Sequence, residues 1–112
     1  MGSIRQSKIE KVIQEELAKL FQRNAKEFCL GAMVTPTAVR VTPDLSLARV
    51  YVSIFAGPTP QEVFDEINKH KARIKGDVGR VIKSLHHIPE LRFFIDDSLD
   101  YAEKIDDLLK NG

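Results

Sequence analysis

Hydrophobic side chains recur at three- and four-residue steps through residues 4–24, the spacing of an amphipathic helix with one buried face. The opposite face mixes Lys, Arg and Glu. We therefore predict one long helix over residues 4–24 whose core-facing stripe consists of Ile9, Val12, Ile13, Leu17, Leu20 and Phe21.

Residues 33–42 and 47–56 have the pattern of two strands. In the second, small and branched apolar residues alternate with Arg49, Tyr51, Ser53 and Phe55, the two-residue period of a half-buried strand. The intervening segment 42–46 contains Pro-Asp, which favours a tight turn. The two strands are predicted to form an antiparallel hairpin.

A helix is predicted to begin after Thr59, because this side chain can cap the amide of Glu62 and Pro60 suits the first helical position. Its inward residues run to about residue 70. A second helical stretch follows, with apolar residues at Ile74, Val78, Val81, Ile82 and Leu85. No glycine or proline in residues 68–73 enforces a break, so the pattern alone leaves a bend there open.

Pro89 ends this stretch, and residues 91–95 form a short strand apolar enough to lie centrally in a sheet. Asp97 or Ser98 can cap a last helix, about residues 99–109. The order α-β-β-α-α-β-α predicts an α+β domain with helices over one face of a three-stranded sheet.

Length and composition narrow the class of protein. The 112 residues fit one domain, and no apolar run approaches the roughly 20 residues that span a bilayer. The N-terminus lacks the apolar core of a signal peptide. A single cysteine, Cys29, excludes an intramolecular disulfide and a multi-cysteine metal site. We expect a reduced, cytoplasmic compartment.

The net charge of +1 hides an uneven distribution. Residues 69–87 carry six Lys or Arg against Asp77 alone, whereas residues 88–112 carry three basic and seven acidic side chains. The molecule is therefore predicted to be a charge dipole with one basic element.

Two stretches resemble the bacterial ribosome-binding factor A family, which has a type II KH-like fold. Residues 39–53 (VRVTPDLSLARVYVS) are similar to its turn and strand, and residues 88–98 (IPELRFFIDDS) to its last strand and exit. The resemblance implies one KH-like domain over residues 1–112, monomeric and non-enzymatic, without a cofactor. It also implies binding to the free small (30S) ribosomal subunit and assistance to late 16S rRNA maturation near the 5′ end, chiefly in the cold.

One feature departs from this family, whose paired helices carry an Ala-x-Gly at their kink. The corresponding place here is Lys71-Ala72-Arg73, so the kink is predicted at Ala72 without the glycine. The chain also contains a Gly-x-x-Gly, Gly76 to Gly79, of the kind that clamps nucleic acid in ordinary KH domains. We interpret it as part of the helix, because it lies inside the periodic stretch and Asp77 would repel phosphate.

The basic element is the main candidate for RNA contact. Its cations cannot all face the core, so most project outward: Lys71, Arg73, Lys75, Arg80 and Lys83. The alternative is a solvated helix face balanced by the acidic C-terminus. Secondary candidates for RNA or ribosome contact are Arg5, Lys8, Arg23 and Arg49. Tyr51 and Phe55 share a strand face, where they either stack on bases or belong to the core.

Two further classes of function remain as alternatives. The first is a protein–protein adaptor without direct RNA binding, in which the charge dipole docks an acidic partner. The second is a hydrolase or metal enzyme using His86, His87 and the acidic tail. Adjacent helical residues point about 100° apart and rarely chelate one ion, so no metal site and no catalytic residue is predicted.

Overall fold

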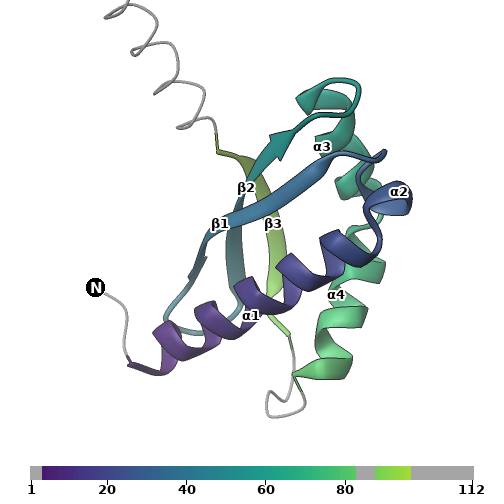
Figure 1. Cartoon of the computed structure of the whole chain (residues 1–112). Coiled ribbons are helices and arrows are strands. Elements are labelled where there is room, and N and C mark those ends of the chain that lie inside the picture. The colour runs from purple at the N-terminus through teal and green to yellow at the C-terminus, as the bar shows by residue number, and fades with distance from the viewer. Residues whose placement is uncertain (1–3, 83–87, 97–112) are drawn as a thin grey trace, which may run out of the picture.

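The computed structural model describes residues 4–82 and 88–96, and the predicted last helix lies outside them. Figure 1 shows a mixed α/β arrangement. The elements are α1 (Ile4–Arg23), α2 (Ala25–Phe28), β1 (Met33–Val41), β2 (Leu47–Phe55), α3 (Pro60–Lys69), α4 (Lys71–Val81) and β3 (Glu90–Ile95).

The predicted hairpin is confirmed. Strands β1 and β2 are antiparallel, with Met33 opposite Phe55 at one end and Val41 opposite Ala48 at the other. The carboxylate of Asp44 organises the turn: its Oδ1 accepts hydrogen bonds from Thr42 Oγ1 at 2.7 Å, Ser46 Oγ at 2.8 Å and Ser46 N at 3.1 Å. These bonds, that of Thr42 foremost, hold the pKa of Asp44 below its ordinary value.

Strand β3 lies at an edge of the sheet and not at its centre, so that prediction was wrong. The strand order is β1-β2-β3, and β3 runs parallel to β2. Leu91 and Phe93 are buried, whereas Arg92 between them is exposed. The apolar residues of β3 reflect the single covered face of the sheet, a requirement that an edge strand shares with a central one.

Part of the outer edge of β1 is bonded by side chains of α1 spaced four residues apart. Gln6 Nε2 donates to the carbonyl of Val41 at 2.9 Å, and Glu10 Oε2 accepts from the amide of Val41 at 2.8 Å. Gln14 Nε2 donates to the carbonyl of Pro36 at 3.0 Å. Pro36 itself has no N–H to present, and the pairing register shifts just after it. Backbone groups of β1 that face away from β2 thus find partners on α1.

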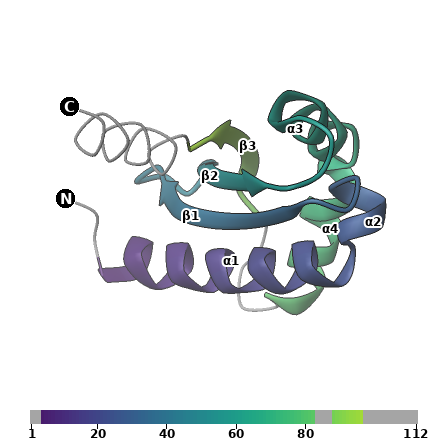
Figure 2. The ribbon, with the colours of Figure 1, turned by 45° about the horizontal axis from the view of Figure 1, so that its top comes forward.

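The core lies between α1 and the sheet. Figure 2 shows α1 running across one face of the strands, with α3 and α4 beside the sheet. Its buried side chains include Ile13, Leu17 and Phe21, which meet inward-facing residues of all three strands. No described helix is long and apolar enough to cross a membrane.

Two residues assigned to buried stripes lie at the margins. Val12 is 40% exposed and Val81 is 57% exposed, while Ile13 and Ile82 are buried. Neighbouring positions are about 100° apart around a helix, so only one of two adjacent apolar residues faces the core fully. Leu85 lies outside the described residues.

The predicted start of α3 is confirmed. Thr59 Oγ1 accepts a hydrogen bond from the amide of Glu62 at 3.1 Å, and Pro60 is the first helical residue. Before the sheet, the short helix α2 is followed by Leu30 and Gly31, which both have positive φ. The sequence pattern did not predict α2, because four residues are too few to show a helical period.

Candidate nucleic-acid interface

Helices α3 and α4 meet at His70, which ends one and begins the other. Its amide donates to the carbonyls of Glu66 at 3.3 Å and Ile67 at 3.1 Å, and its own carbonyl accepts from Ile74 at 2.9 Å. The prediction of a kink at Ala72 was therefore wrong by two residues, since Ala72 lies in the first turn of α4. His70 has φ −99° and ψ 12°, a conformation open to any residue, so the break requires no small side chain.

The basic element carries its cations outward as expected, but each described cation lies beside a carboxylate. In these ion pairs the nitrogen and oxygen atoms lie between 3.0 and 4.0 Å apart, except in the shorter Arg73–Glu27 contact. The partners are Glu66 for Lys69, Glu90 for Lys71 and Lys75, Glu27 and Asp77 for Arg73, and Asp77 for Arg80. Lys75 and, less strongly, Lys71 hold the pKa of Glu90 below its ordinary value.

These carboxylates come from α2, α3, α4 and β3, and one of them, Glu90, belongs to the acidic segment 88–112. Charge counting placed Glu90 in the acidic segment but paired neither Glu27 nor Glu90 with a particular cation, because it does not show which residues the fold brings together. Exposed ion pairs contribute about 0–1 kcal/mol each, so a phosphate group can replace the carboxylate at little cost. The basic element is therefore a set of exchangeable cations.

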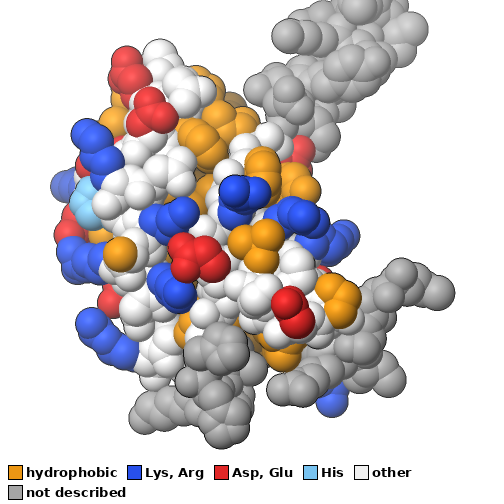
Figure 3. Space-filling model, turned by 180° about the vertical axis from the view of Figure 1, so that it is seen from behind, with side chains coloured by type: hydrophobic (Ala, Val, Ile, Leu, Met, Phe, Trp, Pro, Cys, Tyr) orange, Lys and Arg blue, Asp and Glu red, His pale blue; other side chains and the backbone are white. Residues whose placement is uncertain are grey.

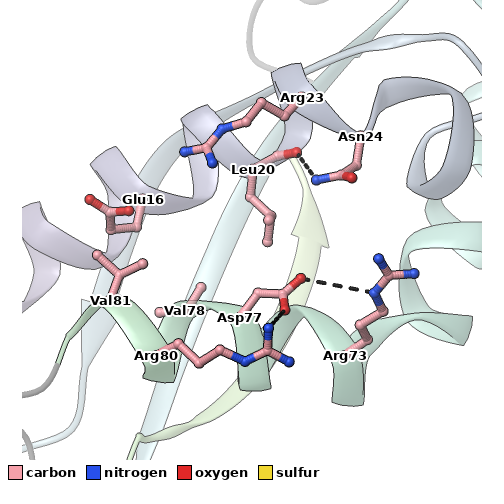
Figure 4. A pocket seen from close by; sticks show the side chains of 9 residues that line it. All are labelled: Glu16, Leu20, Arg23, Asn24, Arg73, Asp77, Val78, Arg80 and Val81. Atoms are coloured by element: carbon pink, nitrogen blue, oxygen red, sulfur yellow. Dashed lines mark hydrogen bonds and ion pairs between the residues drawn. The ribbon is translucent and has the colours of Figure 1, made fainter.

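Two of these cations line a cleft between α1 and α4 (Figure 4). Arg73 and Arg80 come from α4 and Arg23 from α1, while Asp77 lies between the first two at 4.0 and 3.6 Å. The cleft has a volume of about 390 Å³, and its other lining residues are Glu16, Leu20, Asn24, Val78 and Val81. Guanidinium groups bind phosphate in a bidentate manner, so this cleft is a candidate anion site, in which the carboxylates of Glu16 and Asp77 would compete with phosphate.

Arg73 is the most constrained member of the cleft. Besides Asp77 it pairs with Glu27, and its guanidinium lies 5.2 Å from the ring centroid of Phe28. The same ring lies 5.0 Å from that of His70 at the helix junction. Arg73 is thus held against the α2 end of the molecule, while Arg80, 82% exposed, has more freedom.

The Gly-x-x-Gly sequence does not form a loop. Gly76 and Gly79 both lie inside α4, as predicted, so their backbone has helical conformation and not that of a loop. A Cβ on Gly79 would lie 3.1 Å from Cγ1 of Ile88, whereas one on Gly76 would meet no atom within 4 Å. Gly79 therefore has a packing reason to be small.

The remaining predicted contacts are spread over the molecule. Lys8 is exposed on α1, and Arg49 is exposed on the face of β2 that points away from the core. Lys83, His86 and His87 lie outside the described residues, as does the side chain of Arg5. The structure therefore groups Arg73 and Arg80 with Arg23, and leaves Lys8 and Arg49 on separate surfaces.

No cluster of three or more His, Cys, Asp or Glu able to hold a metal occurs in the described part of the chain. Cys29 is fully buried, and burial raises the pKa of its thiol to about 11. Such a thiol is overwhelmingly protonated at neutral pH and is a poor nucleophile.

A three-stranded sheet in the order found here, with one helix before the hairpin and a paired helix before the last strand, defines a KH-like domain. The family model of ribosome-binding factor A matches residues 5–109, and the chain belongs to that family. A ribosome-binding factor A from Christiangramia forsetii is 40% identical over 108 residues, covering 95% of this chain and 82% of the relative.

Two solved structures show the same fold. The crystal structure of ribosome-binding factor A from Thermus thermophilus has a TM-score of 0.69 at 21% identity, covering 80% of this chain and 94% of that one. A homology model of the Thermus thermophilus factor, fitted into a cryo-electron microscopy map of a 30S–RbfA complex, has a TM-score of 0.53 at 19% identity. It covers 72% of this chain and 96% of that one.

Proposed function

We propose that this chain is a non-catalytic assembly factor that binds the free small ribosomal subunit in the cytoplasm. It assists late maturation of 16S rRNA near the 5′ end. Membership of the ribosome-binding factor A family and the fold shared with a 30S-bound relative support this proposal. The observation that carries it is the set of cations on α3 and α4 held in partly exposed ion pairs.

Binding proceeds by exchange of partners. Phosphates of the rRNA replace Glu90 beside Lys71 and Lys75, and enter the cleft beside Arg73 and Arg80. Double-stranded RNA presents mainly phosphates and 2′-hydroxyls to a protein, so these contacts recognise shape rather than base sequence.

The factor acts by holding one conformation of the rRNA. A ligand shifts a conformational equilibrium by its difference in affinity for the two states. Misfolded RNA escapes more slowly at low temperature, so such a factor matters most in the cold.

The test replaces Lys71, Arg73 and Lys75 together by Gln in the full chain. We expect co-sedimentation with free small subunits to be lost, while the melting temperature stays close to that of the wild type. The matched control replaces Lys11, Lys19 and Lys26, exposed cations of α1 and α2, by Gln. Equal binding by both triple variants would remove the helical pair from the mechanism.

A second measurement distinguishes direct RNA binding from the alternative of a protein–protein adaptor. The same variants are titrated against naked 16S rRNA fragments and against isolated small-subunit proteins at several salt concentrations. Steep salt dependence with the RNA is expected. Binding to a protein alone, without affinity for any fragment, would favour the adaptor.

A further inference from the structure

The strand register brings three arginines into one row on the sheet face opposite α1. Arg40 of β1 pairs with Arg49 of β2, and Arg49 pairs with Arg92 of β3. Neighbouring strands lie about 4.8 Å apart, so the backbone positions of the three arginines form one narrow band across the sheet. Figure 3, which looks at this face, shows Lys and Arg side chains across the middle of the molecule, with Asp or Glu side chains beside some of them. We call Arg40, Arg49 and Arg92 the arginine row.

The arginine row differs from the helical cations in having no carboxylate partner within the described residues. All three side chains are exposed, and Arg40 Nη1 donates a hydrogen bond to the carbonyl of Val39 at 3.1 Å. Like charges directly opposite one another destabilise a sheet. The arrangement thus costs stability in the free protein, and a bound polyanion would relieve that cost.

An aromatic pair lies two residues further along the same strands. The rings of Tyr51 on β2 and Phe94 on β3 are stacked, with centroids 5.3 Å apart and planes at 25°. Both side chains are half-buried and lie on the face that carries the arginine row. Beyond them Phe55 is 69% exposed, so Tyr51 and Phe55 belong to the uncovered face and not to the core.

We propose that this sheet face is a second RNA-binding surface, in which the arginine row holds phosphates of a single-stranded segment and an unpaired base packs against Tyr51 and Phe94. The inference rests on the proposed function in taking ribosomal RNA as the polyanion. A single strand fits because a duplex hides the faces of its bases, whereas splayed bases stack on aromatic side chains. Planar guanidinium groups in turn suit phosphate better than a point charge does.

The test uses three full-length variants. In the first, Arg40, Arg49 and Arg92 are replaced together by Gln, and the second is Tyr51→Leu. The control replaces Lys11, Lys19 and Lys26 by Gln, which removes the same charge elsewhere. Fluorescence anisotropy measures binding to an unstructured eight-nucleotide RNA and to a blunt RNA duplex between 50 and 200 mM salt.

The arginine variant is expected to lose about tenfold or more in affinity for the single strand, with a salt slope lower by about two. Tyr51→Leu should lower the affinity for the single strand about tenfold and leave the salt dependence of that affinity unchanged. Duplex binding should change no more than in the control. The melting temperature of the arginine variant at low salt should be no lower than that of the wild type, because the repulsion among the like charges is removed.

Single-strand affinity equal to that of the control would overturn the inference. So would loss of small-subunit binding with single-strand affinity intact, since the face would then contact a ribosomal protein. Either result leaves the proposed function standing if the variant of Lys71, Arg73 and Lys75 still fails to co-sediment.

Discussion

Asp77 lies between Arg73 and Arg80 in the cleft of Figure 4, and replacing it by Asn is expected to tighten binding to the small subunit. In the free protein its carboxylate competes with phosphate for both guanidinium groups, at 4.0 and 3.6 Å. Asn keeps the size of the side chain and removes the competing charge.

The magnitude follows from the two pairs. Each is a partly exposed ion pair, for which about 0.5 kcal/mol is a fair central value. Removing the competition of both gives about 1 kcal/mol, or a dissociation constant about fivefold lower. The extra net positive charge should also steepen the dependence of log affinity on log salt by about 0.7 to 0.9.

The assay is binding to purified free small subunits between 50 and 200 mM salt, with circular dichroism melting to confirm the fold. Asp65→Asn is the control, because Asp65 is exposed on α3, bonds Gln61 at 2.9 Å, and makes no ion pair within the described residues. Affinity of Asp77→Asn equal to or below that of the wild type would refute phosphate exchange in the cleft. An equal gain in both variants would mean that net charge alone is responsible.

Three further predictions concern stability and reactivity. Gly76→Ala should raise the free energy of unfolding in urea by about 0.5–1 kcal/mol, because the added Cβ meets open space. Gly79→Ala should raise it less, because its Cβ presses on Ile88. Equal increases in the two variants would contradict that packing. Thr59→Ala should lower the same free energy by about 1 kcal/mol through loss of the cap, and an unshifted urea midpoint would show that the cap adds nothing. Alkylation of Cys29 by iodoacetamide at pH 8 should be at least about a hundredfold slower in the native protein than in urea, from the smaller thiolate fraction alone, and rapid native labelling would contradict its burial. Because burial raises the pKa of Cys29, the stability from its neutral thiol is present below the ordinary thiol pKa and is lost as the pH rises through about 11.

Local signals in the sequence predicted most of the elements. The apolar spacing of residues 9–21, the alternation of residues 48–55, and the cap at Thr59 each depend on neighbours within a few positions. The structure confirms these elements to within one or two residues at each end. The place of β3 in the sheet could not be predicted in this way, since periodicity reports which face of a strand is buried and not which strand lies beside it.

The candidate site was predicted only in part, for the same reason. The cations of residues 69–83 are conspicuous because they are close in sequence, whereas their partners Glu27 and Glu90 are not. Arg40, Arg49 and Arg92 each occupy an outward position of a strand, which alternation can indicate. Only the pairing register reveals that the three arginines are neighbours.

The bonds from Gln6, Glu10 and Gln14 have a consequence for how the molecule meets other chains. An unpaired strand edge is a template on which a second polypeptide can extend the sheet, the first step in many forms of aggregation. By bonding the backbone of Val41 and Pro36, α1 takes up part of that template from within and leaves fewer backbone groups for a passing unfolded chain to join.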